Sequence, residues 1–113
     1  MYKLLEYSII MASNIECLKA ANEILGDRWT PQLLRAIHNG HSLRFCQIQD
    51  TVGGINPRTL STRLNMLEAN GIISSIADTT PCYNCYQLTK KGQELIPILT
   101  GMGKWSKKYR QST

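Results

Sequence analysis

Apolar residues recur at helical spacing in the first quarter of the chain. The pattern predicts a short amphipathic helix over about Lys3–Met11 and a second helix that follows Ser13 and Asn14 and ends at Gly26. Either Ser13 or Asn14 can cap the second helix, because its side-chain oxygen can accept a free backbone N–H. The apolar side of the second helix carries Ile15, Leu18, Ile24 and Leu25.

Three more helices are predicted in the middle of the chain. Thr30-Pro31 and Asn56-Pro57 each place a favourable N-cap residue before a proline, which is well tolerated at the first helical position. They open helices that end at Asn39-Gly40 and near Asn70, and Arg44–Thr51 forms a short helix between them. The predicted core-facing residues of these helices are Leu33, Leu34, Ile37, Phe45, Ile48, Val52, Leu60, Leu64 and Leu67.

The pattern changes to that of a β-hairpin after residue 70. Ile72–Ile76 has strand character, a polar turn around Pro81 follows, and Cys82–Leu88 is predicted to be the returning strand. Thr89 can cap a last helix that continues to about residue 109, and Pro97 either kinks this helix or is accommodated in its first turns. Its apolar side carries Leu95, Leu99, Met102, Trp105 and Tyr109.

This order of elements describes a winged helix-turn-helix, a mainly α fold with a small β-hairpin (α+β). Gly53-Gly54 is the tight turn between two short helices, and the hairpin that follows them is the wing. We expect one domain over residues 1–113 that dimerises through its N- and C-terminal helices. Its expected parts are terminal dimerisation helices over 1–26 and 90–113 and a DNA-binding core over 30–89, with a recognition helix at 56–70 and a wing at 72–89.

The outer face of the 56–70 helix has the chemistry of a DNA-reading surface. The candidate DNA-contacting residues are Arg58, Thr59, Ser61, Thr62, Arg63 and Asn65. On a helical wheel Thr59 lies at the margin of this face and Arg63 leans toward the core, and no acidic residue occurs on the face before Glu68. Arg58 can form two hydrogen bonds with a guanine and Asn65 can pair with an adenine. The alternative is an ordinary solvated face, since surface helices are usually polar outside.

Composition and charge favour a polyanionic partner. The 113 residues are 42% hydrophobic and 19% charged, which is typical of a folded globular chain, and the formal net charge is +5. Five of the six arginines lie between Arg28 and Arg63, where Asp50 is the only acidic residue strictly inside that window. Arginine suits phosphates and guanine edges, so this clustering strengthens the expectation of double-stranded DNA as the partner.

Three stretches of the chain resemble the HxlR family of bacterial and archaeal regulators. They are ILGDRWTPQLLRAI, RFCQIQDTVGGINPRTLSTRLNMLEANGII, and YQLTKKGQELIPIL with a downstream Trp105, and together they cover roughly Cys17 to Tyr109. The resemblance implies a homodimer, formed mainly by the terminal helices, that binds roughly palindromic DNA. It also implies that Asn56–Glu68 is the recognition helix, and that family DNA-contact or support positions are occupied by Arg58, Ser61 and Arg63.

The same resemblance assigns the wing tip to Asp78–Tyr83, where family members usually carry arginine. This chain has TTPCYNCY there, without arginine or lysine, so we expect a weak minor-groove contact. Many HxlR-like proteins also carry a cysteine shortly before the second helix, and some use it to sense electrophiles or oxidants. Cys17 lies near that place, one residue short in the count to Trp29, and Leu18 replaces the usual proline. Cys17 is therefore our candidate redox sensor, with a buried, inert cysteine as the alternative.

The other three cysteines have simpler expected roles. Cys46 lies in the first turn of a short helix, where the helix dipole favours a thiolate, although a space-filling role is the simpler interpretation. Cys82 and Cys85 form a CxxC without the second ligand pair that a zinc site requires, so we expect no metal. His38 and His41 are expected near a helix C-terminus, not as metal ligands. Trp29 and Trp105 are expected to pack in the core or in a dimer interface.

The sequence gives little support for catalysis, cofactor binding or membrane association. We find no Ser/His/Asp arrangement, paired carboxylates or phosphate-binding glycine loop, and expect neither catalysis nor a cofactor. Two alternatives stay open: a winged-helix protein–protein module that never contacts DNA, and an enzyme with a thiol nucleophile at Cys17 or Cys46. No apolar run approaches the ~20 residues of a membrane span. Glu6 interrupts the apolar start of the chain, so we expect no signal peptide, no membrane partner and a cytoplasmic protein with reduced thiols.

Overall fold

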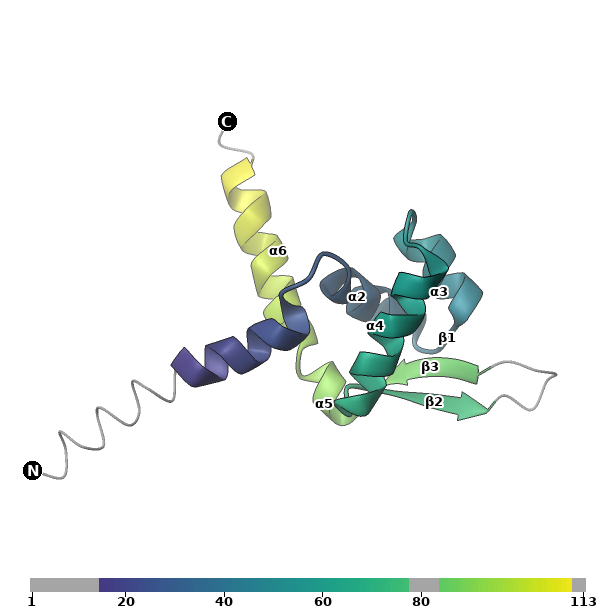
Figure 1. The fold of residues 1–113 in the computed structure, drawn as a ribbon. Helices are drawn as coiled ribbons and strands as arrows, with labels where there is room; N and C mark the ends of the chain where they lie inside the picture. The colour runs from purple at the N-terminus through teal and green to yellow at the C-terminus, as the bar shows by residue number, and fades with distance from the viewer. Residues whose placement is uncertain (1–14, 78–83, 111–113) are drawn as a thin grey trace, which may run out of the picture.

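The computed structural model describes residues 15–77 and 84–110 and has the predicted winged helix-turn-helix order (Figure 1). The predicted helix over Lys3–Met11 and the proposed caps Ser13 and Asn14 lie outside the described residues. A helix over residues 15–25 comes first. The elements after it are α2 (Thr30–Gly40), β1 (Leu43–Arg44), α3 (Phe45–Val52), α4 (Pro57–Ala69), β2 (Ile73–Ala77), β3 (Asn84–Leu88), α5 (Lys90–Gln93) and α6 (Ile96–Arg110).

The core lies where α2, α3 and α4 meet the sheet and the start of α6. Its buried cluster contains Leu33, Leu34, Ile37, Ile48, Ile55, Leu60, Leu64, Leu67, Ile72, Ile73, Leu88, Ile96 and Leu99. The predicted leucine and isoleucine stripes of the three central helices are therefore confirmed, while Phe45 and Val52 are half-buried at the edge of the cluster. Trp29 packs against the same cluster, as expected. The burial of these stripes provides the main stabilisation and orients the polar face of α4 outward.

Among the described residues the sheet has three strands, not the two of the predicted hairpin. The strand order is β1-β3-β2 and both pairings are antiparallel, with Leu43 opposite Tyr86 and Ile73 opposite Leu88. The sequence pattern missed β1 because two residues are too few to show alternation. β2 runs one residue later than predicted, from Ile73 to Ala77. The described part of the returning strand begins at Asn84, and Cys82 lies outside the described residues.

Asn56 caps its helix as predicted, whereas Thr30 does not. The Asn56 side chain accepts a hydrogen bond from the backbone N–H of Arg58 at 2.8 Å. Thr30 is instead the first residue of α2, and Trp29 occupies the N-cap position without a side-chain cap bond. Asp27, two residues before Trp29, takes over this role, because its Oδ1 accepts the backbone N–H groups of Trp29 at 2.8 Å and Thr30 at 2.9 Å. The prediction for Thr30 was wrong because Thr30 already lies inside the helix and its hydroxyl donates to the Asp27 carboxylate instead of accepting a helix N–H. The next helix, α3, begins one residue later than predicted, at Phe45.

The predicted last helix is divided into α5 and α6. Thr89 caps α5 as expected, since its Oγ1 accepts the backbone N–H of Gly92 at 3.1 Å. The helix breaks at residues 94–95, because Pro97 has no N–H to donate to the carbonyl four residues earlier and its ring would clash with that carbonyl. Gly92 is buried against Ile72, the residue before β2, and a Cβ there would lie 2.2 Å from the Ile72 carbonyl oxygen. The break lets α5 pack on the sheet while α6 leaves in another direction.

Two helices extend away from this body: the helix over residues 15–25, purple in Figure 1, and the yellow α6. Ile24 and Leu25 are half-buried against the core, but Leu18 is 70% exposed. Trp105 is 68% exposed and contacts Tyr109, with 5.4 Å between the ring centroids, so it does not belong to the core of the single chain. The large apolar residues exposed on these two helices are Ile15, Leu18, Ile98, Met102, Trp105 and Tyr109.

Candidate nucleic-acid interface

The turn between α3 and α4 presents α4 at the surface. Gly53 and Gly54 have φ angles of 72° and 77°, a left-handed conformation that favours glycine. The backbone N–H of Gly53 donates to the carbonyl of Gln49 at 3.0 Å, and the Gln49 amide donates to the carbonyl of Ile55 at 3.3 Å. These bonds fix where α4 begins relative to α3, as a helix-turn-helix requires.

The exposed face of α4 carries the residues that the wheel placed there. The exposed candidates are Arg58, Ser61, Thr62 and Asn65. Thr59 is half-buried at the margin of the face, as predicted. The Thr62 hydroxyl donates to the carbonyl of Arg58 at 2.9 Å, so its oxygen still offers acceptor capacity toward the outside. The face is polar and cationic from the capped N-terminus to Glu68.

Arg63 points away from this face, toward the start of α2. Its Nη1 lies 3.5 Å from Oδ2 of Asp27, and both side chains are largely shielded from solvent. The same Asp27 oxygen accepts a hydrogen bond from the hydroxyl of Thr30, which is completely buried. One carboxylate thus caps α2 and ties α4 to it. The wheel indicated the inward lean of Arg63 but not its partner, which is 36 positions earlier in the chain.

These contacts make Asp27 a stronger acid. Burial raises the pKa of Asp27, but the hydrogen bonds from Thr30 and Trp29 and the charge of Arg63 outweigh burial and bring the pKa below its usual value. The carboxylate therefore stays ionised at neutral pH, when its charge holds both Arg63 and the N-terminus of α2. Sequence reasoning did not single out Asp27, because a capping residue is expected immediately before the first helical residue and Asp27 lies three residues before Thr30.

The only acidic residue of α4 faces the sheet side of the helix. Oε2 of Glu68 accepts a hydrogen bond from the hydroxyl of Ser75 on β2 at 2.9 Å. Burial and the charge of Glu68 together raise the pKa of Tyr86 on β3. Glu68 therefore connects the end of α4 to the sheet, at the opposite end of the helix from Arg58.

The family model described as "HxlR-like helix-turn-helix" matches residues 24–113. The chain belongs to this family. A relative named an uncharacterized HTH-type transcriptional regulator, YvaP of Bacillus subtilis, is 36% identical over 90 residues, which are 79% of this chain and 82% of YvaP. The resemblance noted in the sequence and the transcription-regulator class of this family are thus confirmed.

Two solved structures of regulators have the same fold as this HxlR-like chain. The reduced form of YodB from B. subtilis superposes with a TM-score of 0.74 at 29% identity, and the match covers 84% of this chain and 93% of YodB. The reduced form of the redox regulator HypR superposes with a TM-score of 0.75 at 28% identity, covering 82% and 92% of the two chains. YodB has also been solved in diamide-treated and quinone-bound forms.

The cysteines of this HxlR-like chain lie at different depths. Cys17 and Cys46 are exposed in the single chain, so Cys17 is not buried within it, and Cys85 is half-buried in β3. Cys46 is in the first turn of α3, as predicted. Cys82 and the rest of the predicted wing tip, Asp78–Tyr83, lie outside the described residues, so its weak minor-groove contact stays a prediction.

Across residues 15–77 and 84–110, no three or more His, Cys, Asp or Glu side chains gather as a metal site would require. His38 lies in the last turn of α2, and the backbone N–H of His41 donates to its carbonyl at 3.2 Å, so both histidines occupy the helix C-terminus as expected. In the same part of the chain, none of the helices is both long and apolar enough to span a bilayer.

Proposed function

We propose that this protein is a sequence-specific, DNA-binding transcriptional regulator that acts as a homodimer on a roughly palindromic operator. The exposed face of α4 carries the proposal, because it is cationic, free of acid up to Glu68 and presented by a helix-turn-helix. Membership of the HxlR-like family and the likeness to the transcriptional regulators YodB and HypR support the same role. We propose no catalytic role, and a cytoplasmic location, where a bacterial or archaeal regulator meets its DNA.

The residues of α4 divide into three proposed roles. Arg58 and Asn65 contact base edges in the major groove, because their side chains match the edges of guanine and adenine. Thr59, Ser61 and Thr62 bind phosphates or base edges. Arg63 supports the interface from behind, since its guanidinium is held by Asp27 instead of pointing toward the groove.

The proposed dimer is formed by the segments 1–26 and 90–113. Its support is the apolar surface of the helix over residues 15–25 and of α6, where Leu18 and Trp105 are largely exposed in the single chain. A second copy would cover this surface and place two α4 helices about 34 Å apart, in successive major grooves. Light scattering at micromolar concentration should therefore give twice the mass of the chain, and a monomer that still binds DNA tightly would contradict the proposal.

The DNA-reading role is tested with Arg58. We expect Arg58→Ala to weaken binding to the operator by about 1–3 kcal/mol and to relax base preference at one position per half-site, measured by fluorescence anisotropy on operator variants. Arg58→Lys is the matched control, because it keeps the charge but not the planar fork. It should keep the salt dependence of binding and lose the base preference. Unchanged binding by both variants would remove α4 from the DNA and favour a protein–protein module.

We also propose Cys17 as the site of a redox or electrophile response. The support is its exposure on the helix over residues 15–25, beside the apolar Leu18 of the proposed dimer surface, and the diamide-treated and quinone-bound states known for YodB. An adduct at Cys17 would change how two copies pack and hence the spacing of their recognition helices. DNA binding of Cys17→Ser should resist diamide, whereas Cys46→Ser should respond as the parent does. A Cys17→Ser variant that still responds would exclude this role.

A further inference from the structure

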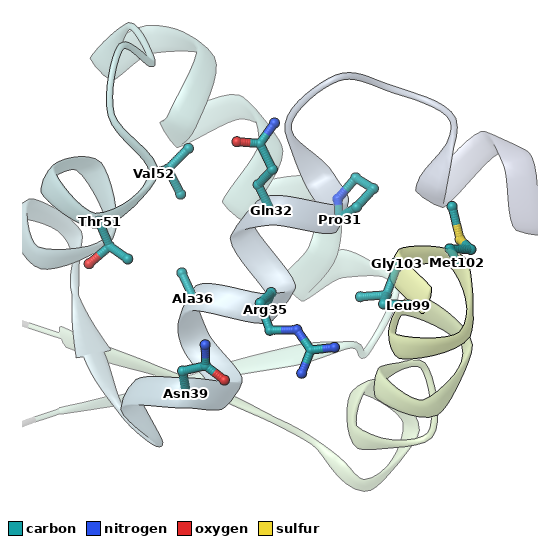
Figure 2. A pocket seen from close by; sticks show the side chains of 10 residues that line it. All are labelled: Pro31, Gln32, Arg35, Ala36, Asn39, Thr51, Val52, Leu99, Met102 and Gly103. Carbon is teal, nitrogen blue, oxygen red and sulfur yellow. The ribbon is translucent and has the colours of Figure 1, made fainter. Parts of the chain in front are cut away.

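A hollow opens between α2, the C-terminal end of α3 and the middle of α6 (Figure 2). None of the residues that line it belongs to α4. Its volume is about 490 Å³, within the range of small-molecule sites. Ala36, Val52, Leu99 and Met102 form its apolar wall. Ala36 and Leu99 are buried parts of the domain, so this wall is held by the core and is already formed without a ligand.

One full charge faces this apolar wall. Figure 2 shows Arg35 extending from α2 toward α6, beside Leu99. Its Nη2 donates to the hydroxyl of Thr100 at 2.6 Å, which is a neutral partner. Among residues 15–77 and 84–110, no carboxylate lies within ion-pair distance of Arg35, and none of the residues that line the hollow is acidic. A half-buried guanidinium has five N–H donors, and Thr100 uses only one of them.

The rest of the lining suits an organic ligand better than a bare ion. Asn39 and Thr51 are exposed at the edge of the hollow and can bond polar substituents. An inorganic anion would satisfy Arg35 but would leave the apolar wall wet. A neutral apolar molecule would cover the wall but would bring the guanidinium into a drier environment without a counterion, which costs free energy. Only a molecule that has both an anionic group and an apolar body can satisfy the Arg35 guanidinium and also cover the apolar wall.

We propose that this hollow binds a small organic carboxylate with an apolar body, such as an aromatic acid. The carboxylate forms a two-point contact with the Arg35 guanidinium, because the planar fork of arginine matches the geometry of a carboxylate. The apolar body lies against Ala36, Val52 and Leu99. Such a ligand would contact α2, the end of α3 in the helix-turn-helix, and α6, so its binding would fix the orientation of α6 on the domain. The ligand site does not depend on the DNA-binding role proposed above.

The test is a two-dimensional ¹H–¹⁵N NMR titration of the full chain with benzoate, and with benzamide as a neutral molecule of the same shape. Benzoate should produce saturable shifts at the amides around Ala36, Val52 and Leu99. Benzamide should bind about tenfold more weakly or worse, because it cannot form the charged hydrogen bonds. Equal binding of the two molecules, or shifts confined to the outer face of α6, would overturn the proposal.

Two arginine variants make the test specific. Arg35→Gln should lose about tenfold or more in benzoate affinity, whereas Arg28→Gln, which removes an exposed arginine stacked on Trp29 at 4.7 Å, should bind as the parent does. Arg35→Lys, which keeps the charge, should retain part of the affinity, and well-dispersed spectra will show that each variant is folded. Equal affinity of the two glutamine variants would refute a role for Arg35. Absence of saturable shifts at tens of millimolar benzoate would refute the site itself. This outcome includes the case in which a second copy covers the hollow and keeps benzoate out.

Discussion

Replacing Asp27 with alanine should destabilise the domain more than a typical surface substitution, because one carboxylate serves two elements. It accepts the backbone N–H groups of Trp29 and Thr30 at 2.8 and 2.9 Å and the Thr30 hydroxyl, and it lies 3.5 Å from the guanidinium of Arg63. Alanine removes the cap of α2, leaves the buried Thr30 hydroxyl without its acceptor and leaves Arg63 without its counterion.

The size of the effect follows from these three losses. Loss of an N-cap costs about 1 kcal/mol, within a range of about 0.5–2. A buried hydroxyl without a partner costs about 1–3 kcal/mol. A partly exposed ion pair contributes about 0.2–1 kcal/mol. The losses share one side chain and do not add fully, so we expect Asp27→Ala to lower the free energy of unfolding by about 2–4 kcal/mol. For a domain of this size that lowers Tm by about 10–25 °C.

Asp27→Asn separates the cap from the charge. Its amide oxygen can still accept the backbone N–H groups of Trp29 and Thr30, so it should cost only about 1 kcal/mol. Urea denaturation followed by circular dichroism, at one fixed protein concentration, measures both variants. Stability of Asp27→Ala within about 0.5 kcal/mol of the parent would refute the reasoning. An asparagine variant as unstable as the alanine variant would show that the ion pair, and not the cap, dominates.

The pH dependence gives a second measure of the same contact. The folded-state pKa of Asp27 is lower than its usual value, so protonation is harder in the folded chain than in the unfolded chain. Its contribution to stability is complete above the unfolded-state pKa, about 3.9, and is lost as the pH falls through the folded-state value. The stability advantage of the parent over Asp27→Asn should therefore be constant near neutral pH and shrink in this acidic range. An advantage that does not change with pH would contradict the assignment.

Two further substitutions test the packing of the C-terminal helices. Gly92→Ala should lower the free energy of unfolding in urea by about 2–3 kcal/mol, because the new Cβ would lie 2.2 Å from the Ile72 carbonyl oxygen. Gly101→Ala is the control and should not destabilise the chain, because nothing lies within 4 Å of its new Cβ. Equal stability of the two variants would contradict the close approach of α5 to the sheet. Trp105→Ser should lower the mass measured by light scattering from that of the proposed dimer toward that of a monomer. Circular dichroism should stay that of a folded chain, because Trp105 is 68% exposed in the single chain. An unchanged mass would exclude Trp105 from the proposed interface.

Much of the fold could be predicted from local patterns, because those patterns act over a few neighbouring residues. The capped start of α4 at Asn56-Pro57 and the Gly53-Gly54 turn depend on backbone geometry that each residue type favours by itself. The outward face of α4 was predictable for a related reason. Helical geometry fixes the angle between successive side chains, so the buried leucine stripe also determines that Arg58 and Asn65 are exposed.

Only the tertiary structure decided the contacts between residues that are distant in the chain. β1 exists only because Leu43 and Arg44 pair with β3, more than 40 positions later, and the Arg63 partner Asp27 belongs to another helix start. The hollow beside Arg35 is likewise formed by three helices, and no sequence window contains it. Short-range preferences determine an element and its faces, whereas pairing, ion pairs and cavities depend on which faces the hydrophobic core brings together.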